Sequence, residues 1–412
     1  MKPFAVQKVL GLLLMLFSLS MFPPVLVSLI YGDGAALPFL SAFFLIFGVG
    51  LLIWLPVYRS RQELKLRDGF LVVVLFWTAL GLSGSLPFIL ADNPGLSVTD
   101  AIFESMSGLT TTGATVIIGI DELPKSVLFY RQQLQWLGGM GIIVLAVAVL
   151  PMLGIGGMQL YRAETPGPIK DSKLTPRITE TAKALWYIYL GLTIACALAY
   201  WLAGMSAFDA VGHSFSTVAI GGFSTHDDSI GYFDSTQVEM IAVVFMLISG
   251  VNFALHFLAW NGRNPVVYLR DSEFRFYLLL IAAATAIVTV SLYLTDTYID
   301  WEESFTQGLF QTVSIGTTTG FTTAEFYYWP GFLEILLLFT SFVGGCAGST
   351  GGGIKVIRFL LLIKQGLREI SRLVHPNAQL PVRMGSRTVN HRVVDAVWGF
   401  FSLYVASFTF MY

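Results

Sequence analysis

Long apolar stretches alternate with short polar connections along almost the whole chain. A helix of about 20 apolar residues spans a bilayer, and it satisfies its backbone hydrogen bonds internally. Nine segments qualify as candidates: residues 4–30, 36–57, 69–90, 127–153, 183–204, 236–260, 274–295, 330–363 and 392–412. The pattern therefore predicts an all-α polytopic membrane protein.

The first segment has a second interpretation, because Lys2 and Lys8 give it the basic start of a secretory signal peptide. A signal peptide has a shorter apolar core that is closed by a small-residue cleavage site. Residues 4–30 are too long and lack such a site. We expect this segment to be retained as a membrane helix.

Composition agrees with the segment pattern. Charged residues make up only 12% of the 412 residues, and hydrophobic residues make up 55%. No soluble fold of this size could bury so much apolar surface, and disordered, collagen-like and disulfide-stapled classes are excluded as well. Cys196 and Cys346 are expected to be buried and unpaired. The net charge of −2 gives no reason to expect a nucleic-acid partner.

Basic residues fall on one side of the predicted membrane. With a cytoplasmic N-terminus, the inner ends and loops hold 22 of the 24 Lys and Arg residues, and only Lys125 and Arg131 lie outside. This is the distribution that the positive-inside rule predicts. Acidic residues gather in the outer loops, where they either concentrate cations at an entrance or form a merely solvated face. They are Asp121, Glu122, Asp227, Asp228, Asp300, Glu302, Glu303 and Glu325.

Three outer connections share one pattern: Asp100–Thr115, Asp209–Ser224 and Gln307–Thr322. Each opens with an acid or an amide, has a serine seven residues later and a glycine six residues after that. The serines are Ser107, Ser216 and Ser314, and the glycines are Gly113, Gly222 and Gly320. Because each connection lies between two apolar segments, the chain is predicted to repeat a helix–loop–helix unit.

Each connection is long enough for a short helix followed by an irregular segment. The first ten residues would form a half-helix of about 15 Å whose partially negative C-terminal end faces the membrane centre. Irregular backbone is tolerated at that depth only where it lines protein or water, and rings of backbone carbonyls select potassium. The irregular segments are Thr110, Thr111, Thr112 and Gly113; Ala219, Ile220, Gly221 and Gly222; and Thr317, Thr318, Thr319 and Gly320. A single such stretch would be an ordinary outer loop, but three in register favour a filter.

The sequences SMSGLTTTGAT and TVSIGTTTGFT resemble pore loops of the Trk/Ktr/HKT superfamily of potassium transporters. The two additional N-terminal segments are similar to those of its TrkH/TrkG branch, and the resemblance covers essentially the whole chain. It implies pseudo-fourfold repeats of helix, pore loop and helix around a central pore. The potassium ligands it implies are the backbone carbonyls of Thr111, Thr112, Ile220, Gly221, Thr318 and Thr319. Glycine at position 113 favours potassium over sodium, whereas the second segment departs from Thr-Thr-Thr-Gly.

The implied layout has five parts. They are two N-terminal helices (1–68), a first repeat (69–153, pore loop 100–115), a second (154–260, pore loop 209–224), a third (261–368, pore loop 307–322) and a linker with the first helix of an incomplete fourth repeat (369–412). No fourth glycine-bearing loop follows in these 412 residues. We therefore expect that they do not conduct selectively by themselves.

The eighth apolar segment contains a glycine run that would destabilise a helix by about 1 kcal/mol per glycine relative to alanine. It should break into 330–343, an intramembrane loop and 354–368. A phosphate-binding loop would need a preceding strand and a Gly-Lys-Ser/Thr ending, which are missing. The resemblance makes the loop a cytoplasmic gate, with the glycines Gly344, Gly345, Gly348, Gly351, Gly352 and Gly353.

Other polar residues suggest support instead of catalysis. Glu104, His213 and Gln311 occupy one repeat position, and they either anchor the half-helices or tune ion entry. Asn252 and His256, on one face of the helix predicted at 236–260, suit interhelical hydrogen bonds better than a metal. Metal-ligand spacing and a hydrolase nucleophile elbow are both missing from the sequence.

These observations predict a pore-forming subunit for potassium uptake, with potassium as the transported ion and no organic cofactor. A non-conducting scaffold subunit and a polytopic membrane enzyme are the alternatives. The resemblance implies a bacterial inner-membrane location, a homodimer and a nucleotide-binding TrkA-like regulatory partner on the basic stretches 154–183 and 364–392. Those stretches could instead meet anionic lipid headgroups.

Overall fold

A computed structural model describes residues 3–60, 62, 66–144, 178–376, 378, 380–385 and 387–411. The apolar segment predicted at 127–153 is therefore described only as far as residue 144. Most of the predicted cytoplasmic stretch 154–183 lies outside the described residues.

Six predicted membrane segments are helical runs long and apolar enough to cross a membrane. They are Pro3–Tyr31, Ala36–Val57, Leu71–Leu90, Lys183–Leu202, Ser272–Leu294 and Val393–Met411. The first run tolerates Pro23 and Pro24 because they lie in the first turn of α2, where backbone amides need no helical acceptor. The all-α prediction is confirmed for these segments.

The continuous helix predicted over 236–260 is wrong. It is interrupted at residues 250–252, between α12 and α13. Glycine and asparagine both disfavour a helix interior, and Asn252 Oδ1 instead accepts a hydrogen bond from the Ala254 amide at 2.8 Å and caps α13. Asn252 and His256 therefore do not share a face of one long helix. The His256 ring contacts the Tyr268 hydroxyl at 2.8 Å.

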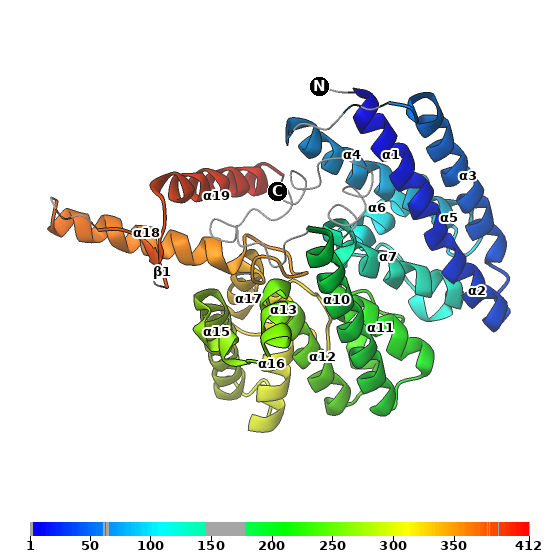
Figure 1. Ribbon diagram of the computed structural model, residues 1–412. Helices are drawn as coiled ribbons and strands as arrows, with labels where there is room; N and C mark the ends of the chain where they lie inside the picture. The colour runs from blue at the N-terminus through cyan, green and yellow to red at the C-terminus, as the bar shows by residue number, and fades with distance from the viewer. Residues whose placement is uncertain are drawn as a thin grey trace. The chain divides into compact units, whose positions relative to one another are not determined.

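The segment predicted at 330–363 divides around its glycine run, as expected. Most of the longer helices are labelled in Figure 1. The elements of the described chain are α1 (Pro3–Ser18), η1 (Leu19–Met21), α2 (Phe22–Tyr31), α3 (Ala36–Trp54), η2 (Leu55–Val57), α4 (Leu66–Gly84), α5 (Leu86–Leu90), α6 (Val98–Leu109), η3 (Ile120–Glu122), α7 (Lys125–Val144), α10 (Ile178–Leu202), α11 (Ala207–Ala219), η5 (Ser229–Phe233), α12 (Thr236–Ser249), α13 (Phe253–Gly262), α14 (Val266–Arg270), α15 (Ser272–Leu294), α16 (Trp301–Gly316), η6 (Phe326–Tyr328), α17 (Leu333–Val343), α18 (Val356–Val374), β1 (Arg383–Met384), β2 (Arg387–Thr388) and α19 (His391–Met411).

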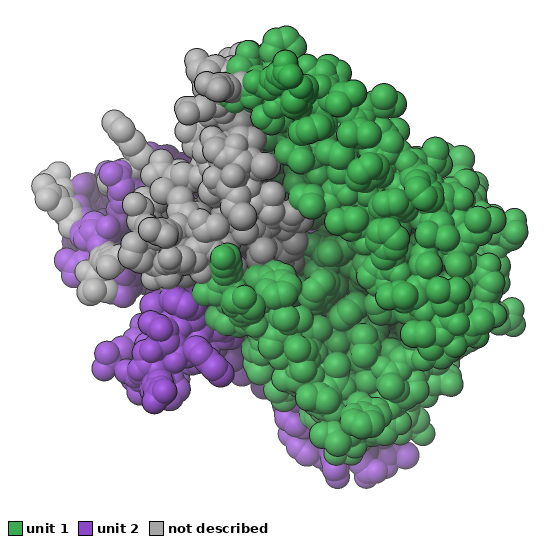
Figure 2. All heavy atoms as spheres, turned by 45° about the vertical axis from the view of Figure 1, so that its right-hand side comes forward, with its two compact units in different colours: residues 1–165, 175–249, 319–325 green, residues 166–174, 250–318, 326–412 purple. Residues whose placement is uncertain are grey.

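The chain forms two compact units, coloured in Figure 2. Unit 1 contains residues 1–165, 175–249 and 319–325, and unit 2 contains residues 166–174, 250–318 and 326–412. The third pore loop is shared, because its Thr317 and Thr318 belong to unit 2 whereas Thr319 and Gly320 belong to unit 1. The repeat boundaries predicted from the sequence differ from this division and stay predictions.

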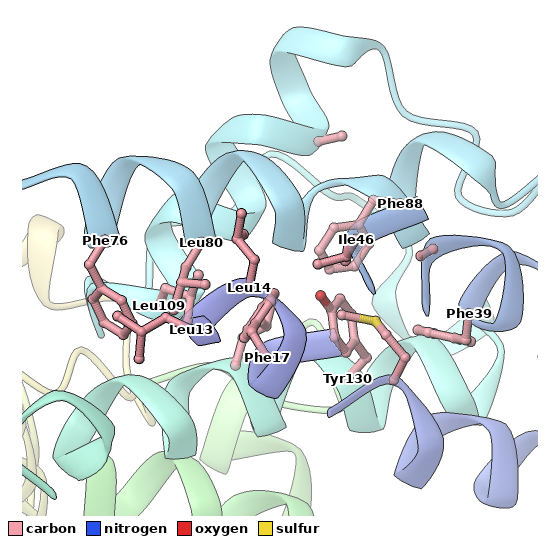
Figure 3. Close-up of a cluster of buried hydrophobic side chains, with 14 of the residues drawn as sticks. Leu13, Leu14, Phe17, Phe39, Ile46, Phe76, Leu80, Phe88, Leu109 and Tyr130 are labelled. Atoms are coloured by element: carbon pink, nitrogen blue, oxygen red, sulfur yellow. The ribbon is translucent and has the colours of Figure 1, made fainter. Parts of the chain in front are cut away.

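The core of unit 1 lies among the N-terminal helices and the first repeat (Figure 3). Leu14 and Phe17 of α1 are buried there together with Phe88 of α5 and Tyr130 of α7. The Tyr130 hydroxyl donates to the Gly84 carbonyl oxygen at 2.9 Å, which satisfies the one polar atom of that ring. The N-terminal helices thus support the helix that follows the first pore loop.

In unit 2, α15 packs against α16, α17 and α18. The N-terminal half of α18 forms a second apolar cluster with α19 and with the two-stranded antiparallel hairpin of β1 and β2. Leu361 of α18, Met384 of β1 and Val394 of α19 are buried in this cluster. The cluster holds α18, the helix that follows the glycine run, in place.

Candidate functional site

Three short helices lead into the predicted filter segments: α6, α11 and α16. The first two begin with the same cap, in which a serine hydroxyl accepts from the amide three residues later and donates to that residue's carboxylate. The pairs are Ser97 with Asp100 and Ser206 with Asp209, with donor–acceptor distances of 2.7–3.2 Å. The caps satisfy helix amides and place negative charge at the positive end of the helix dipole.

The third helix starts earlier than the repeat predicts. It begins at Trp301, six residues before Gln307, and it follows Asp300, whose side chain makes no capping hydrogen bond. Glu302 and Glu303 in its first turn supply the negative charge instead. The three helices are thus present as predicted, although the third is longer.

The backbone beyond each helix takes the same conformation in all three loops. The second residue of each filter segment is β-branched and has a positive φ: 53° at Thr111, 55° at Ile220 and 71° at Thr318. The fourth residue is glycine with φ of 80°, 78° and 87° at Gly113, Gly222 and Gly320. A positive φ is a genuine outlier for a β-branched residue, and its repetition at equivalent positions marks a functional constraint.

The three loops meet in unit 1. A Cβ added to Gly113 would lie within 3 Å of the Gly221 carbonyl oxygen and 3.4 Å from that of Thr319. A Cβ added to Gly222 would overlap the Thr319 carbonyl oxygen. Only glycine permits this approach together with the positive φ. At Gly320, by contrast, a Cβ would meet no described atom within 4 Å.

A buried ion pair links the first half-helix to α7. Arg131 Nε lies 2.7 Å from Glu104 Oε1, and both side chains are fully buried. The guanidinium also donates to the Thr115 hydroxyl and the Ser224 carbonyl oxygen, each at 3.1 Å. Arg131 therefore joins the segments that follow the first and second filters.

Two of the three polar residues at the shared repeat position, Glu104 and His213, hydrogen-bond to residues beyond their predicted filter segments. Glu104 accepts hydrogen bonds from the Thr115 hydroxyl at 3.0 Å and the Val116 amide at 3.3 Å. His213, at the equivalent position, contacts the Ser224 hydroxyl at 2.9 Å. Each anchor thus reaches the residue 11 positions later, just beyond the filter.

Two glutamines of α7 hydrogen-bond to the backbone of the second predicted filter segment and of the residue that follows it. Gln135 donates to the Gly221 carbonyl oxygen at 2.6 Å and accepts from the Phe223 amide at 3.0 Å. Gln132 donates to the Phe223 carbonyl oxygen at 3.2 Å. Sequence reasoning missed these glutamines and the role of Arg131. The signal available was that Arg131 is one of two basic residues outside the predicted inner loops.

A charged cluster lies beyond the second filter. The imidazole of His226 hydrogen-bonds to the Asp121 carboxylate, and its Nε2 lies 3.5 Å from Asp209 Oδ1. Burial lowers the pKa of His226, but the two carboxylates offset this and raise the pKa above its usual 6.5. The pKa of Asp121 is lowered, because hydrogen bonds from His226 and Asp227 outweigh the effect of burial. The cluster ties the outer segment after the first filter to the second half-helix.

The glycine run of unit 2 is held at several points. The Cys346 amide donates to the Gly250 carbonyl oxygen at 2.8 Å, and the Phe253 amide donates to the Gly348 carbonyl oxygen at 2.9 Å. The interruption in one apolar segment therefore pairs with the interruption in another. This pairing satisfies backbone groups that a broken helix leaves exposed.

The same run contacts the third filter segment and a buried carboxylate. The Gly352 amide donates to the Thr318 hydroxyl at 2.7 Å, and a Cβ on Gly351 would lie 3.0 Å from the Thr317 carbonyl oxygen. Glu273 of α15 accepts from the Ala347 amide at 2.6 Å. The loop is therefore packed directly against Thr317 and Thr318, the first two residues of the third predicted filter segment.

Repeated half-helices, glycine-bearing loops and apolar spans define a polytopic cation transport protein. The family model described as "TrkH: Cation transport protein" matches residues 37–411, and the chain belongs to the TrkH family. The family resemblance predicted from the pore-loop sequences is confirmed. This family transports cations and is not a family of enzymes.

Named relatives cover nearly the whole chain. The Trk system potassium uptake protein TrkH of Vibrio parahaemolyticus is 62% identical over 406 residues, 98% of this chain and 84% of the relative. TrkH of Escherichia coli K12 is 57% identical over 404 residues, with the same shares covered, and its TrkG is 44% identical over 394 residues, 96% of this chain and 81% of TrkG.

A solved structure confirms the fold. The chain matches the crystal structure of the potassium transporter TrkH from Vibrio parahaemolyticus with a TM-score of 0.90 and 58% sequence identity. The match covers 99% of this chain and 84% of the solved one.

Proposed function

We propose that this chain is the pore-forming subunit of a potassium uptake system. The single observation that carries the proposal is the convergence of three loops with the same alternating positive φ on one another's backbone oxygens. Such oxygens replace the hydration shell of potassium in a filter. The relatives named as potassium uptake proteins support the same conclusion.

The proposed ion ligands are the backbone carbonyls of the second and third residues of each filter segment. They are those of Thr111, Thr112, Ile220, Gly221, Thr318 and Thr319. A positive φ at alternate residues turns successive carbonyls in a common direction, which supports this assignment. Potassium uptake needs no reaction catalysed by the chain, because a cation that moves inward gains about 2.3 kcal/mol per 100 mV of inside-negative potential.

We further propose that Gly344–Gly353 is the gate. Its contacts with Thr317 and Thr318 support this, since a loop packed against a filter segment obstructs passage until it moves. Location in a bacterial inner membrane with a cytoplasmic N-terminus, a homodimeric assembly and a TrkA-like regulatory partner complete the proposal. The inner excess of Lys and Arg supports the orientation.

The test is potassium-limited growth of an uptake-deficient host. The chain covers 84% of its Vibrio relative, so the host should express residues 1–412 followed by the remainder of that protein. We expect rescue, and we expect Gly113→Asp to abolish it, because the new carboxylate would enter the space between the three loops. Gly34→Asp is the matched control, since Gly34 also has a positive φ (76°) but has no described atom near a Cβ.

Rescue that survives Gly113→Asp at equal expression would refute the filter. Failure of the unmutated form to rescue, at normal expression in the membrane, would instead favour the non-conducting scaffold.

A further inference from the structure

The second filter lacks the side chains that stabilise its neighbours. Where the first and third segments have threonine at their first and third positions, the second has Ala219 and Gly221. The threonine hydroxyls bond within their own loops: Thr110 donates to the Met106 carbonyl oxygen at 2.7 Å and lies 2.8 Å from the Thr112 hydroxyl. Thr317 likewise donates to the Val313 carbonyl oxygen at 2.7 Å. The second loop has no hydroxyl at either position.

A side chain from the preceding repeat occupies the vacated space. A Cβ added to Gly221 would lie within 3 Å of Gln135 Cδ, Oε1 and Nε2, and Gln135 is fully buried. Threonine at 221 would therefore push the Gln135 amide group out of its place and break its two hydrogen bonds. The Gln135 amide group fits beside residue 221 only because that residue is glycine.

Both polar atoms of this glutamine are used on the filter backbone. Its Nε2 donates to the Gly221 carbonyl oxygen at 2.6 Å, and its Oε1 accepts from the Phe223 amide at 3.0 Å. Gly222, the glycine that approaches the third loop, lies between these two residues in the sequence. The Gln135 amide group therefore bonds to the backbone on both sides of Gly222.

We propose that Gln135 is a positioning residue for ion selection: it replaces the missing threonine and fixes the direction of the Gly221 carbonyl. The inference rests on the proposed function, since it concerns the shape of the proposed filter. A carbonyl that accepts a hydrogen bond from a buried amide has one lone pair committed and loses freedom to tilt. The second quarter of the filter thereby becomes more rigid, so that it cannot collapse around the smaller sodium ion.

The test measures rubidium uptake, as a substitute for potassium, and its inhibition by sodium, in proteoliposomes containing the extended chain described above. Gln135→Leu removes both hydrogen bonds at similar side-chain volume. Only the bond to the Gly221 carbonyl holds a proposed ion ligand, so the preference for potassium over sodium should fall about tenfold, the effect of one hydrogen bond. Gln133→Leu is the matched control. Gln133 is also a buried glutamine of α7, but it donates to the Ser20 carbonyl oxygen at 2.9 Å, away from the filter, and its loss should leave the preference unchanged.

A compensating pair guards against variants that merely fold poorly. Gly221→Thr alone should reduce uptake, because its Cβ would displace the Gln135 amide group and break the two hydrogen bonds of that group. Adding Gln135→Ala removes the overlapping side chain. The double variant, whose second filter segment reads Ala-Ile-Thr-Gly, should recover uptake. Recovery in the double variant supports the proposal even if Gln135→Leu cannot be purified.

The outcomes separate this inference from the filter assignment. If Gly222→Ser alters the ion preference and Gln135→Leu does not, the role of Gln135 is overturned and the filter stands. If both glutamine variants shift the preference equally, Gln135 acts only through general packing and the inference is again overturned. If neither Gly222→Ser nor Gln135→Leu changes it, the filter assignment falls together with the inference.

Discussion

Removing both partners of the buried Arg131–Glu104 pair should destabilise unit 1 by less than the sum of the two single removals. Glu104→Gln leaves a guanidinium fully buried without its counter-charge, and Arg131→Met leaves a buried carboxylate. Loss of one partner of such a pair costs about 3–5 kcal/mol. The double variant contains no uncompensated charge, so this penalty is absent from it.

The two single variants should therefore each lose about 3 kcal/mol or more of unfolding free energy, and the double variant should lose less than their sum by at least about 2 kcal/mol. The assay is SDS-induced unfolding in mixed micelles, read by intrinsic fluorescence for the parent, both single variants and the double variant. Arg372 and Glu369 provide the control pair. The Arg372 guanidinium lies 3.3 Å from the Glu369 carboxylate, and both side chains are about half exposed, so their double-mutant cycle should show no measurable coupling. Additive losses at Arg131 and Glu104 would refute the reasoning.

Three further predictions follow from other contacts. Folding raises the pKa of His226, so the proton-linked part of its contribution to stability is complete below pH 6.5 and disappears as pH rises through the raised folded pKa. The difference in melting temperature between the parent and His226→Gln across pH 5–9 should therefore shrink toward the alkaline end. Deleting Gly344–Gly353 from the extended chain should raise rubidium flux, and unchanged flux would remove the gate assignment. Gly138→Ala should cost about 1–3 kcal/mol in the same SDS titration, because its Cβ would overlap the Leu109 carbonyl oxygen. Gly191→Ala, in open space on α10, should instead be neutral or stabilise by up to about 1 kcal/mol.

The sequence predicted most of the spans and the register of the three loops because both depend on local pattern. Apolar length identifies a span, and the spacing of Gly113, Gly222 and Gly320 identifies a repeat. The interruption at 250–252 could also have been anticipated, since Gly250 and Asn252 are poor residues for a helix interior. The long apolar run around them outweighed that signal.

The supports of the filter could not be predicted in the same way. Gln135 and Gly221 are 86 residues apart, and nothing in either local pattern indicates that they touch. The missing threonine was visible as a departure from Thr-Thr-Thr-Gly, but the side chain that compensates for it is known only once the helices are placed. Contacts across repeats depend on tertiary packing, which a single sequence does not specify.

The paired interruptions in unit 2 have a consequence for how the glycine run could open. The Cys346–Gly250 and Phe253–Gly348 hydrogen bonds would both break if the loop moved away from residues 250–253. Each buried donor or acceptor left bare would cost about 1–3 kcal/mol, unless water replaces the lost partner. Water that enters the break as the loop moves would therefore lower the free-energy cost of displacing it.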